Sequence, residues 1–154
     1  MSDLALGQPA PAIELPRDGG STVSLSDFAG KQVVLYFYPK DDTPGCTKEA
    51  IGFTEMDSEF AEAGAVVLGV SKDSVTKHDK FIKKHDLGVI LLSDEDSDVC
   101  ERYGVWVEKN MYGKKYMGIE RATFLIGTDG AIKQIWRKVK VPGHVEAVLE
   151  AVKA

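Results

Sequence analysis

The chain has 154 residues and a net charge of −5 at pH 7, with 44% hydrophobic and 28% charged side chains. These values are typical of one folded domain, residues 1–154, and they exclude disordered, collagen-like and coiled-coil chains. Two cysteines are too few for a disulfide scaffold, and the acidic balance argues against a nucleic-acid partner.

The first residues, MSDLALGQPAPAIEL, have neither the basic start nor the long apolar block of a secretory signal. The longest apolar-rich stretches, such as residues 63–70, are far shorter than the roughly 20 residues of a membrane helix. We therefore expect a cytoplasmic protein in a reducing compartment, with no membrane partner.

Strands and helices are expected to alternate along the chain. Two short strands at 12–15 and 22–25 come first, and a strand at 33–38 reads as buried on both faces. The remaining expected elements are a helix at about 44–63, a strand at 65–70, a helix at about 74–86, a strand at 89–92, a helix at 93–103, a hairpin of 123–126 with 131–136, and a last helix that follows Pro142 and Gly143 and runs through Val152.

This order predicts an α/β protein with a thioredoxin-like fold, in which a mixed central sheet is flanked by helices and extended by N-terminal strands. Residues 104–120 show little regular pattern. A loop of that length inside a compact domain is usually functional or mobile, so we expect such a loop there.

Cys46 stands where the buried strand has ended and a helix begins. Thr43 suits the N-cap of that helix, and Pro44 suits its first position, where the missing N–H group costs nothing. In the first helical turn, unpaired backbone N–H groups and the helix dipole favour a thiolate over a thiol. The thiolate is the nucleophilic form, so the position indicates a reactive cysteine. The alternative is a cysteine that only fills the core.

Pro39, Thr43 and Cys46 form the pattern P-x-x-x-T-x-x-C, which resembles the peroxidatic motif of the peroxiredoxins. Three longer segments are similar to the bacterioferritin comigratory protein or peroxiredoxin Q branch: YFYPKDDTPGCTKE, LSDEDSDVCERYGVW and GIERATFLI. The resemblance covers nearly the whole chain in matching order. It implies a thiol peroxidase acting on hydrogen peroxide and organic hydroperoxides, with no metal or bound cofactor.

The resemblance also implies roles for single residues. The Cys46 thiolate attacks a peroxide oxygen and becomes a sulfenic acid, while Arg121 faces the negative charge with fixed guanidinium donors. The Thr43 hydroxyl and the first N–H groups of the helix bind the peroxide oxygens, and the Pro39 ring shields the thiolate from water. Glu49, one helical turn after the cysteine, either orients Arg121 without contacting the reacting atoms or is a plain surface glutamate.

The sequence departs from the branch at the residue that would resolve the sulfenic acid. Many members carry a second cysteine five residues after the first, where this chain has Ile51. Others carry it in the next helix, where the expected register gives Ile82. Cys100 is the one other thiol, expected in the core, with an unusual resolving role as the alternative. We therefore expect a one-cysteine cycle completed by an outside thiol.

The expected reductant is thioredoxin, or a glutathione–glutaredoxin pair as the alternative, and the expected state is a monomer or a weak dimer. Two other functions stay open from the residues. One is a thiol–disulfide oxidoreductase on the same fold, which the lack of a C-x-x-C pair weakens. The other is a non-enzymatic chaperone or redox sensor.

Two further groups of residues have less specific patterns. His78 and His85, seven residues apart on one helix face, and the distant His144 lack a metal-ligand spacing, so we expect a solvated face. Residues 109–140 hold eight basic and two acidic residues, a net charge of +6. Such a segment is either a solvated basic surface or an electropositive wall beside an anion site.

Overall fold

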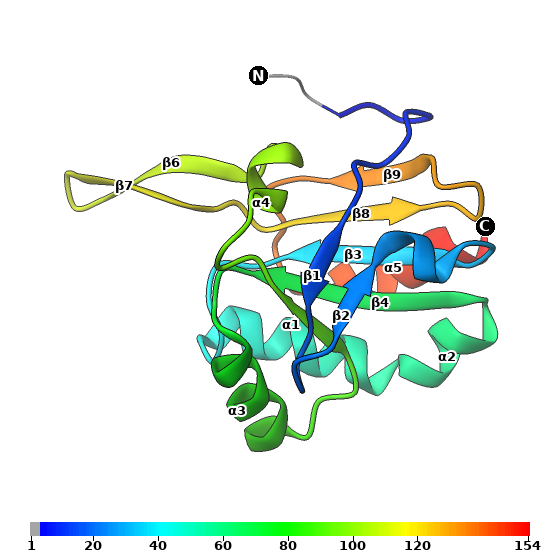
Figure 1. The fold of residues 1–154 in the computed structure, drawn as a ribbon, viewed down its shortest axis with the longest axis horizontal. Coiled ribbons are helices and arrows are strands. Elements are labelled where there is room, and N and C mark those ends of the chain that lie inside the picture. Colours follow the sequence, from blue (N-terminus) through cyan, green and yellow to red (C-terminus); the bar gives the residue numbers. More distant parts are fainter. Residues whose placement is uncertain (1–3) are drawn as a thin grey trace.

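The computed structural model describes residues 4–154, and its centre is β3 (Gln32–Phe37), a strand of mostly β-branched and aromatic residues buried almost throughout. β4 (Ala65–Ser71) pairs parallel to one edge of β3, and β5 (Ile90–Ser93) pairs parallel to β4. On the other edge, β8 (Ala122–Ile126) and β9 (Ile132–Trp136) form the predicted antiparallel hairpin. The predicted mixed sheet is therefore confirmed, in the order β5-β4-β3-β8-β9 (Figure 1).

One face of this sheet is covered by short elements. The predicted N-terminal strands are present as β1 (Glu14–Pro16) and β2 (Thr22–Ser24), and the 3-10 turn η1 (Leu25–Phe28) follows them. They pack with α4 (Val99–Arg102) over the side chains of β3 that include Phe37. We call this the strand-side core.

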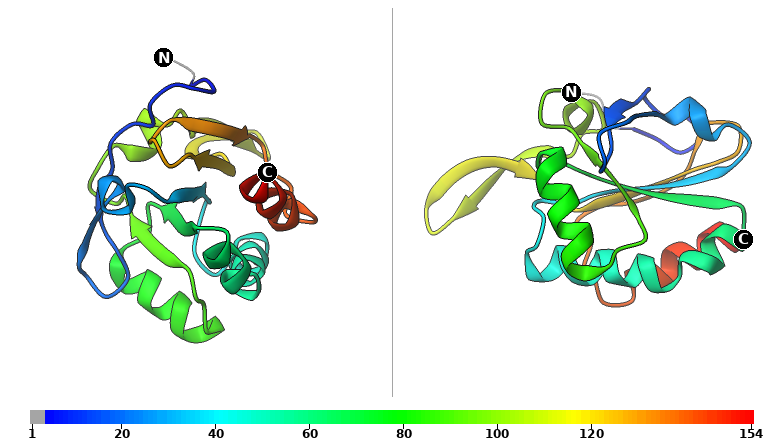
Figure 2. Two further views of the ribbon diagram at one scale, coloured as in Figure 1. Left: turned by 90° about the vertical axis from the view of Figure 1, so that its right-hand side faces the viewer. Right: turned by 60° about the horizontal axis from the view of Figure 1, so that its bottom comes forward.

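The other face of the sheet is covered by the longer helices. α1 (Pro44–Glu55), α2 (Asp57–Glu62), α3 (Val75–His85) and α5 (His144–Lys153) lie together on this side (Figure 2). Their apolar residues form a second core with the alternate side chains of β3, which include Tyr36. We call this the helix-side core, and no helix within residues 4–154 is long and apolar enough to cross a membrane.

Two predicted helices are shorter than the sequence suggested. The helix expected to reach residue 63 breaks at Met56, whose backbone (φ −101°, ψ 12°) leaves the helical range. Just before the break, the Thr54 hydroxyl donates to the Ala50 carbonyl, a bond that bends helices. The helix expected at 93–103 is reduced to α4, because the buried Asp94 carboxylate accepts the first N–H groups of α4 and holds the preceding residues as a turn.

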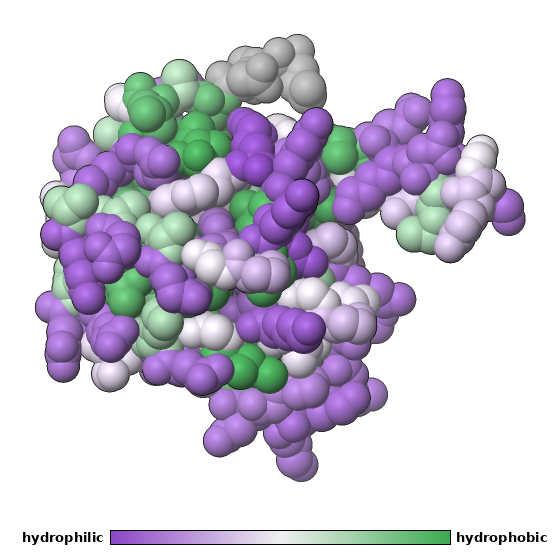
Figure 3. Space-filling view, turned by 180° about the vertical axis from the view of Figure 1, so that it is seen from behind, coloured by the Kyte–Doolittle hydropathy of each residue, from purple (hydrophilic) through white to green (hydrophobic). Residues whose placement is uncertain are grey.

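The loop expected at residues 104–120 is instead a hairpin of β6 (Trp106–Met111) and β7 (Lys114–Ile119). Tyr112 and Gly113 both have positive φ at its turn, as a tight two-residue turn requires. The hairpin projects from the rounded body and carries hydrophilic and hydrophobic residues together (Figure 3). Both strands are largely exposed, so they lack the alternation of apolar and polar residues that reveals a strand in a sequence.

Candidate active site

Cys46 lies in the first turn of α1, directly after the loop that leaves the end of β3. Its side chain is 1% exposed and packs in the helix-side core. Thr43 precedes the helix with extended backbone (φ −93°, ψ 156°), and Pro44 begins the helix. The predicted start of this helix is therefore confirmed, and it leaves the cysteine beside the unpaired N–H groups of the first turn.

Arg121 reaches the same place from a distant part of the chain. In the antiparallel register of β3 and β8, Phe37 lies opposite Ala122, so Arg121 comes next to the point where the chain leaves β3. Its Nη2 donates to Cys46 Sγ over 3.3 Å, and its Nη1 donates to Glu49 Oε1 over 2.7 Å. The sheet thus brings a sulfur, a guanidinium and a carboxylate together.

Glu49 is a buried residue, and the alternative of a plain surface glutamate is wrong. Its side chain is 0% exposed, and its Oε2 atom has no hydrogen-bond partner within the described residues. Burial raises the pKa of Glu49 to about 7, although Arg121 acts in the opposite direction. Burial by itself lowers the pKa of Arg121, but Glu49 and Cys46 outweigh it and raise that pKa.

Gly45 is a further site residue that the sequence reading missed. A Cβ atom at this position would lie 3.1 Å from Nη2 of Arg121 and 3.8 Å from its Cζ. The absence of a side chain therefore gives the guanidinium room to approach the sulfur. The glycine directly before Cys46 in the sequence was the available signal.

The positions of Thr43 and Pro39 match their expected roles only in part. The Thr43 hydroxyl donates to the Lys40 carbonyl over 2.9 Å, and the side chain does not cap α1. Pro39 is exposed where the chain leaves β3. Both residues border the loop that leads to the sulfur, and their parts in binding peroxide and excluding water stay predictions.

Cys100 lies away from this site. It is 0% exposed in the strand-side core, whereas Cys46 belongs to the helix-side core, so the central sheet separates the two sulfurs. Burial, with the Asp94 carboxylate next in effect, raises the pKa of the Cys100 thiol. Ile51 and Ile82, at the two positions where relatives of the branch carry a second cysteine, pack against the helix-side core.

The expectation of a solvated histidine face is wrong for two of the three histidines. His78 is 0% exposed and His144 is 6% exposed, and each is hydrogen-bonded inside the fold. Burial, with Arg121 next, lowers the pKa of His144 to about 4. Across residues 4–154, no group of three or more His, Cys, Asp or Glu side chains could hold a metal ion.

The basic segment at 109–140 divides into two parts. Arg121 is half-buried and contacts the sulfur, and Lys109 is half-buried close enough for both residues to affect its pKa. Burial, with Arg121 next, lowers the pKa of Lys109, and Cys46 opposes the shift. Lys114 and Lys115 are exposed on β7. The segment is therefore an electropositive wall at the site and a solvated basic surface elsewhere.

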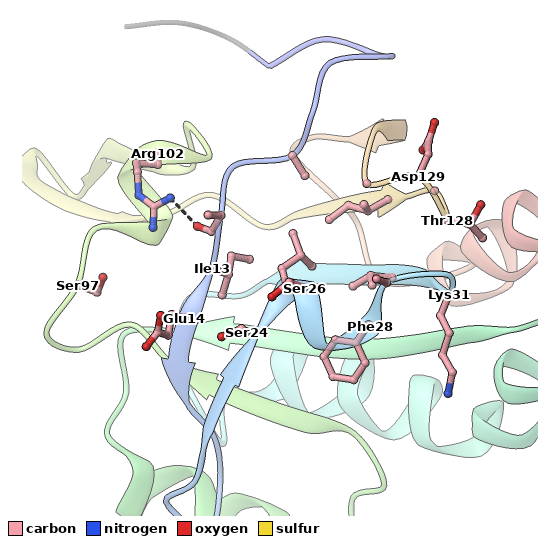
Figure 4. Close-up of a pocket in the computed structure, with 18 residues that line it drawn as sticks. Ile13, Glu14, Ser24, Ser26, Phe28, Lys31, Ser97, Arg102, Thr128 and Asp129 are labelled. Carbon is pink, nitrogen blue, oxygen red and sulfur yellow. Dashed lines mark hydrogen bonds between the residues drawn. The ribbon is translucent and has the colours of Figure 1, made fainter.

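A cavity of about 630 Å³ opens far from this site, between η1 and the turn that joins β8 to β9 (Figure 4). Its lining includes Phe28, Ile13 and Arg102, whose Nη1 donates to the Ala12 carbonyl. None of the residues around Cys46 lines it. The cavity is therefore separate from the site around the sulfur.

Known proteins match the chain over nearly its full length. The AhpC/TSA family matches residues 6–135. Peroxiredoxin Bcp of Bacillus subtilis is 52% identical over 150 residues, which cover 97% of this chain and 96% of the relative. This chain belongs to the peroxiredoxins. Because members of this family are thiol peroxidases, it is an enzyme that reduces peroxides at the expense of thiols.

Solved peroxiredoxin structures confirm the thioredoxin-like fold. The bacterioferritin comigratory protein of Xanthomonas campestris, studied for alkyl peroxide reduction, is 48% identical with a TM-score of 0.90 over 98% of both chains. PrxQ of Xylella fastidiosa is 42% identical with a TM-score of 0.93, over 99% of this chain and 98% of that one. The predicted branch of the peroxiredoxin family is also confirmed.

Proposed function

We propose that the Cys46 thiolate attacks hydrogen peroxide and organic hydroperoxides. The sulfur bonds to one peroxide oxygen, the O–O bond breaks, and the other oxygen leaves as hydroxide or alkoxide, which gives the Cys46 sulfenic acid. The alkyl peroxide reduction studied in the Xanthomonas campestris relative supports the organic part of this substrate class.

The observation that carries the proposal is the guanidinium of Arg121, 3.3 Å from the Cys46 sulfur. An arginine stays cationic at every physiological pH, so it stabilises the thiolate before attack and the charge that develops on the leaving oxygen. The bond to Glu49 fixes one edge of the guanidinium and leaves another for the reacting atoms.

The loop residues complete the binding of peroxide. Because the Thr43 hydroxyl proton is used by the Lys40 carbonyl, Oγ1 of Thr43 offers lone pairs that accept the O–H group of a peroxide. The uncapped N–H groups of the first turn of α1 donate to the peroxide oxygens. The rigid ring of Pro39, which has no N–H group to offer water, lies at the start of the loop that leads to the sulfur.

An outside thiol completes the cycle. The thiol attacks the sulfenic sulfur, water leaves, and a second thiol reduces the mixed disulfide that results. Separation of Cys46 from Cys100 by the sheet, and isoleucine at positions 51 and 82, support this one-cysteine cycle. Thioredoxin is the proposed reductant and a glutathione–glutaredoxin pair the alternative, both acting on a cytoplasmic monomer or weak dimer.

Peroxide consumption with purified reductant systems tests these assignments. Thioredoxin with its reductase, and glutaredoxin with glutathione, are supplied in turn to the wild type, Cys46→Ser and Cys100→Ser. The proposal expects Cys46→Ser to be inactive and Cys100→Ser to turn over like the wild type. Full activity without Cys46, or its loss without Cys100, would contradict the proposed cycle.

A further inference from the structure

A buried group of polar side chains lies beneath the loop that carries Thr43. His78 of α3 is 0% exposed, and its Nδ1 lies 2.7 Å from Asp41 Oδ2. Its Nε2 lies 3.0 Å from the Leu92 carbonyl oxygen at the end of β5. Tyr38 donates from its hydroxyl to the other carboxylate oxygen, Oδ1 of Asp41, over 2.6 Å.

These contacts indicate how many protons the pair of His78 and Asp41 holds. The Leu92 carbonyl can only accept, so Nε2 of His78 carries a proton. Nδ1 faces a carboxylate at 2.7 Å, and one further proton lies between these two atoms, either on the imidazole or on Asp41. The pair therefore holds one shared proton and no net charge inside the core.

Asp41 stands in the middle of the loop between β3 and α1, two residues before Thr43 and five before Cys46. Its backbone N–H donates to Asp73 Oδ2 over 2.7 Å, so the loop is fixed both to α3 and to the end of β4. The next residue, Asp42, has φ 62°, a sharp left-handed turn that its surroundings must hold.

A second set of contacts joins the same loop to the same helix on the surface. Asp42 accepts hydrogen bonds from Lys84 over 2.7 Å and from His85 over 2.8 Å. The Asp42 and Lys84 side chains are 42% and 62% exposed, and exposed ion pairs contribute little to holding a structure in place. The buried contact is the one able to define the position of the loop.

We propose that His78 is a positioning residue for peroxide reduction, which through Asp41 holds the loop so that Thr43 and the first turn of α1 meet the peroxide. The inference rests on the proposed function and adds to it a residue that touches neither the sulfur nor the substrate. Arg121 is held separately by Glu49, so loss of the histidine leaves the cation beside the sulfur.

The shared proton makes the positioning dependent on pH. Burial lowers the pKa of His78, but the bonds to Asp41 outweigh it, so the pKa lies above its usual value. The pair is intact below this raised pKa, and at higher pH it becomes a neutral imidazole facing a buried carboxylate. The titratable groups that face the imidazole from other elements are Tyr38, Asp41 and Asp73. Asp41 and Asp73 line a cavity together with the charged residues Lys40, Asp42, Lys77, Lys80 and Lys84.

Three variants test the proposal. In His78→Gln, the glutamine side chain cannot contact Asp41 and the Leu92 carbonyl at once. In Asp41→Asn, a neutral His78 keeps its hydrogen bonds to residue 41 and to the Leu92 carbonyl, and the two side chains share no extra proton. His85→Gln is the matched control, because it removes an exposed contact to the same loop from the same helix. Circular dichroism checks folding, stopped-flow fluorescence follows Cys46 oxidation by hydrogen peroxide, and iodoacetamide alkylation reports the thiolate without needing a bound peroxide.

Oxidation is expected to slow about tenfold or more in His78→Gln, with Cys46 alkylation within about twofold of the wild type. Asp41→Asn and His85→Gln should keep most of the rate at pH 7. The wild-type rate should decline at alkaline pH and the Asp41→Asn rate should not, a comparison that stands even if His78→Gln fails to fold.

An unchanged rate in His78→Gln, an equal loss in His85→Gln, or no alkaline decline in the wild type would overturn the inference. Slow oxidation of the wild type itself would instead contradict the proposed function.

Discussion

Cys46 and Cys100 are both buried, on opposite faces of the central sheet. A disulfide requires Cα atoms within about 7 Å and side chains that point toward each other, so the sheet would have to open to join these two. The native fold therefore leaves a Cys46 sulfenic acid without an internal thiol to meet it.

After one equivalent of hydrogen peroxide, we expect dimedone to trap Cys46 while Cys100 remains free. Intact-mass analysis under denaturing alkylation measures both outcomes on the same sample. Excess peroxide should carry Cys46 onward to sulfinic acid, because no internal thiol intercepts the sulfenic acid. A Cys46–Cys100 disulfide as the main product would show that the protein resolves its own intermediate.

Replacement of Arg121 by lysine keeps one positive charge but loses the planar fork that binds Glu49 and the sulfur together. We expect Arg121→Lys to slow Cys46 oxidation by about 100-fold, the usual effect of removing one donor from a developing charge. Arg137→Lys is the control, since Arg137 contacts Glu120 over 3.9 Å and the Phe124 ring and makes no hydrogen bond to Cys46 or Glu49. Equal rates in the two variants would remove Arg121 from the reaction.

Two glycines of α1 should respond to alanine in opposite ways. A Cβ at Gly45 would press on the Arg121 guanidinium, so Gly45→Ala should slow oxidation about five- to tenfold with little loss of stability. A Cβ at Gly52 would lie 3.0 Å from Val145 Cγ2, so Gly52→Ala should keep its rate but lose about 1–2 kcal/mol of stability. Stopped-flow oxidation and urea unfolding separate the two effects. The same pattern in both variants would contradict this assignment.

Glu49 should make the stability of the fold depend on pH. Its pKa is about 7 in the folded protein against an ordinary value of 4.5, so the unfolded chain releases this proton first as pH rises. The free energy of unfolding therefore falls between about pH 4.5 and 7 and is level above that range. Glu49 accounts for a fall of up to about 3 kcal/mol.

Glu49→Gln cannot release a proton, so its stability should lack that decline. Urea unfolding of both proteins from pH 4.5 to 8 isolates the contribution of this one carboxyl, because other titrations are common to both. Parallel curves for the wild type and Glu49→Gln would show that Glu49 titrates normally.

The order of the elements could be predicted because buried parallel strands and helix starts leave clear local patterns. Residues 33–38 predicted a strand with two buried faces, which the structure has at 32–37, and Thr43 with Pro44 predicted the helix start. The reactivity of Cys46 could be predicted from its place at this helix start alone. Arg121, by contrast, entered through the family resemblance, because its approach to the sulfur depends on the pairing of β3 with β8.

Other features could not be predicted, for physical reasons. His78 is buried because partners meet both of its ring nitrogens, and these partners lie 37 and 14 residues away, at Asp41 and Leu92. The hairpin at 106–119 has little buried surface and therefore little pattern. The exposure of Pro39 depends on the path of the loop, which composition does not define.

The sequence separation of 75 positions from Cys46 to Arg121 also determines when the protein acquires its complete site during synthesis. The cysteine leaves the ribosome early, while the arginine and β8, which begins directly after it, belong to the last third of the chain. Until β8 has been made and has paired with β3, the thiol has no guanidinium beside it. A nascent or truncated chain without β8 therefore lacks the guanidinium that stabilises the thiolate in the finished fold.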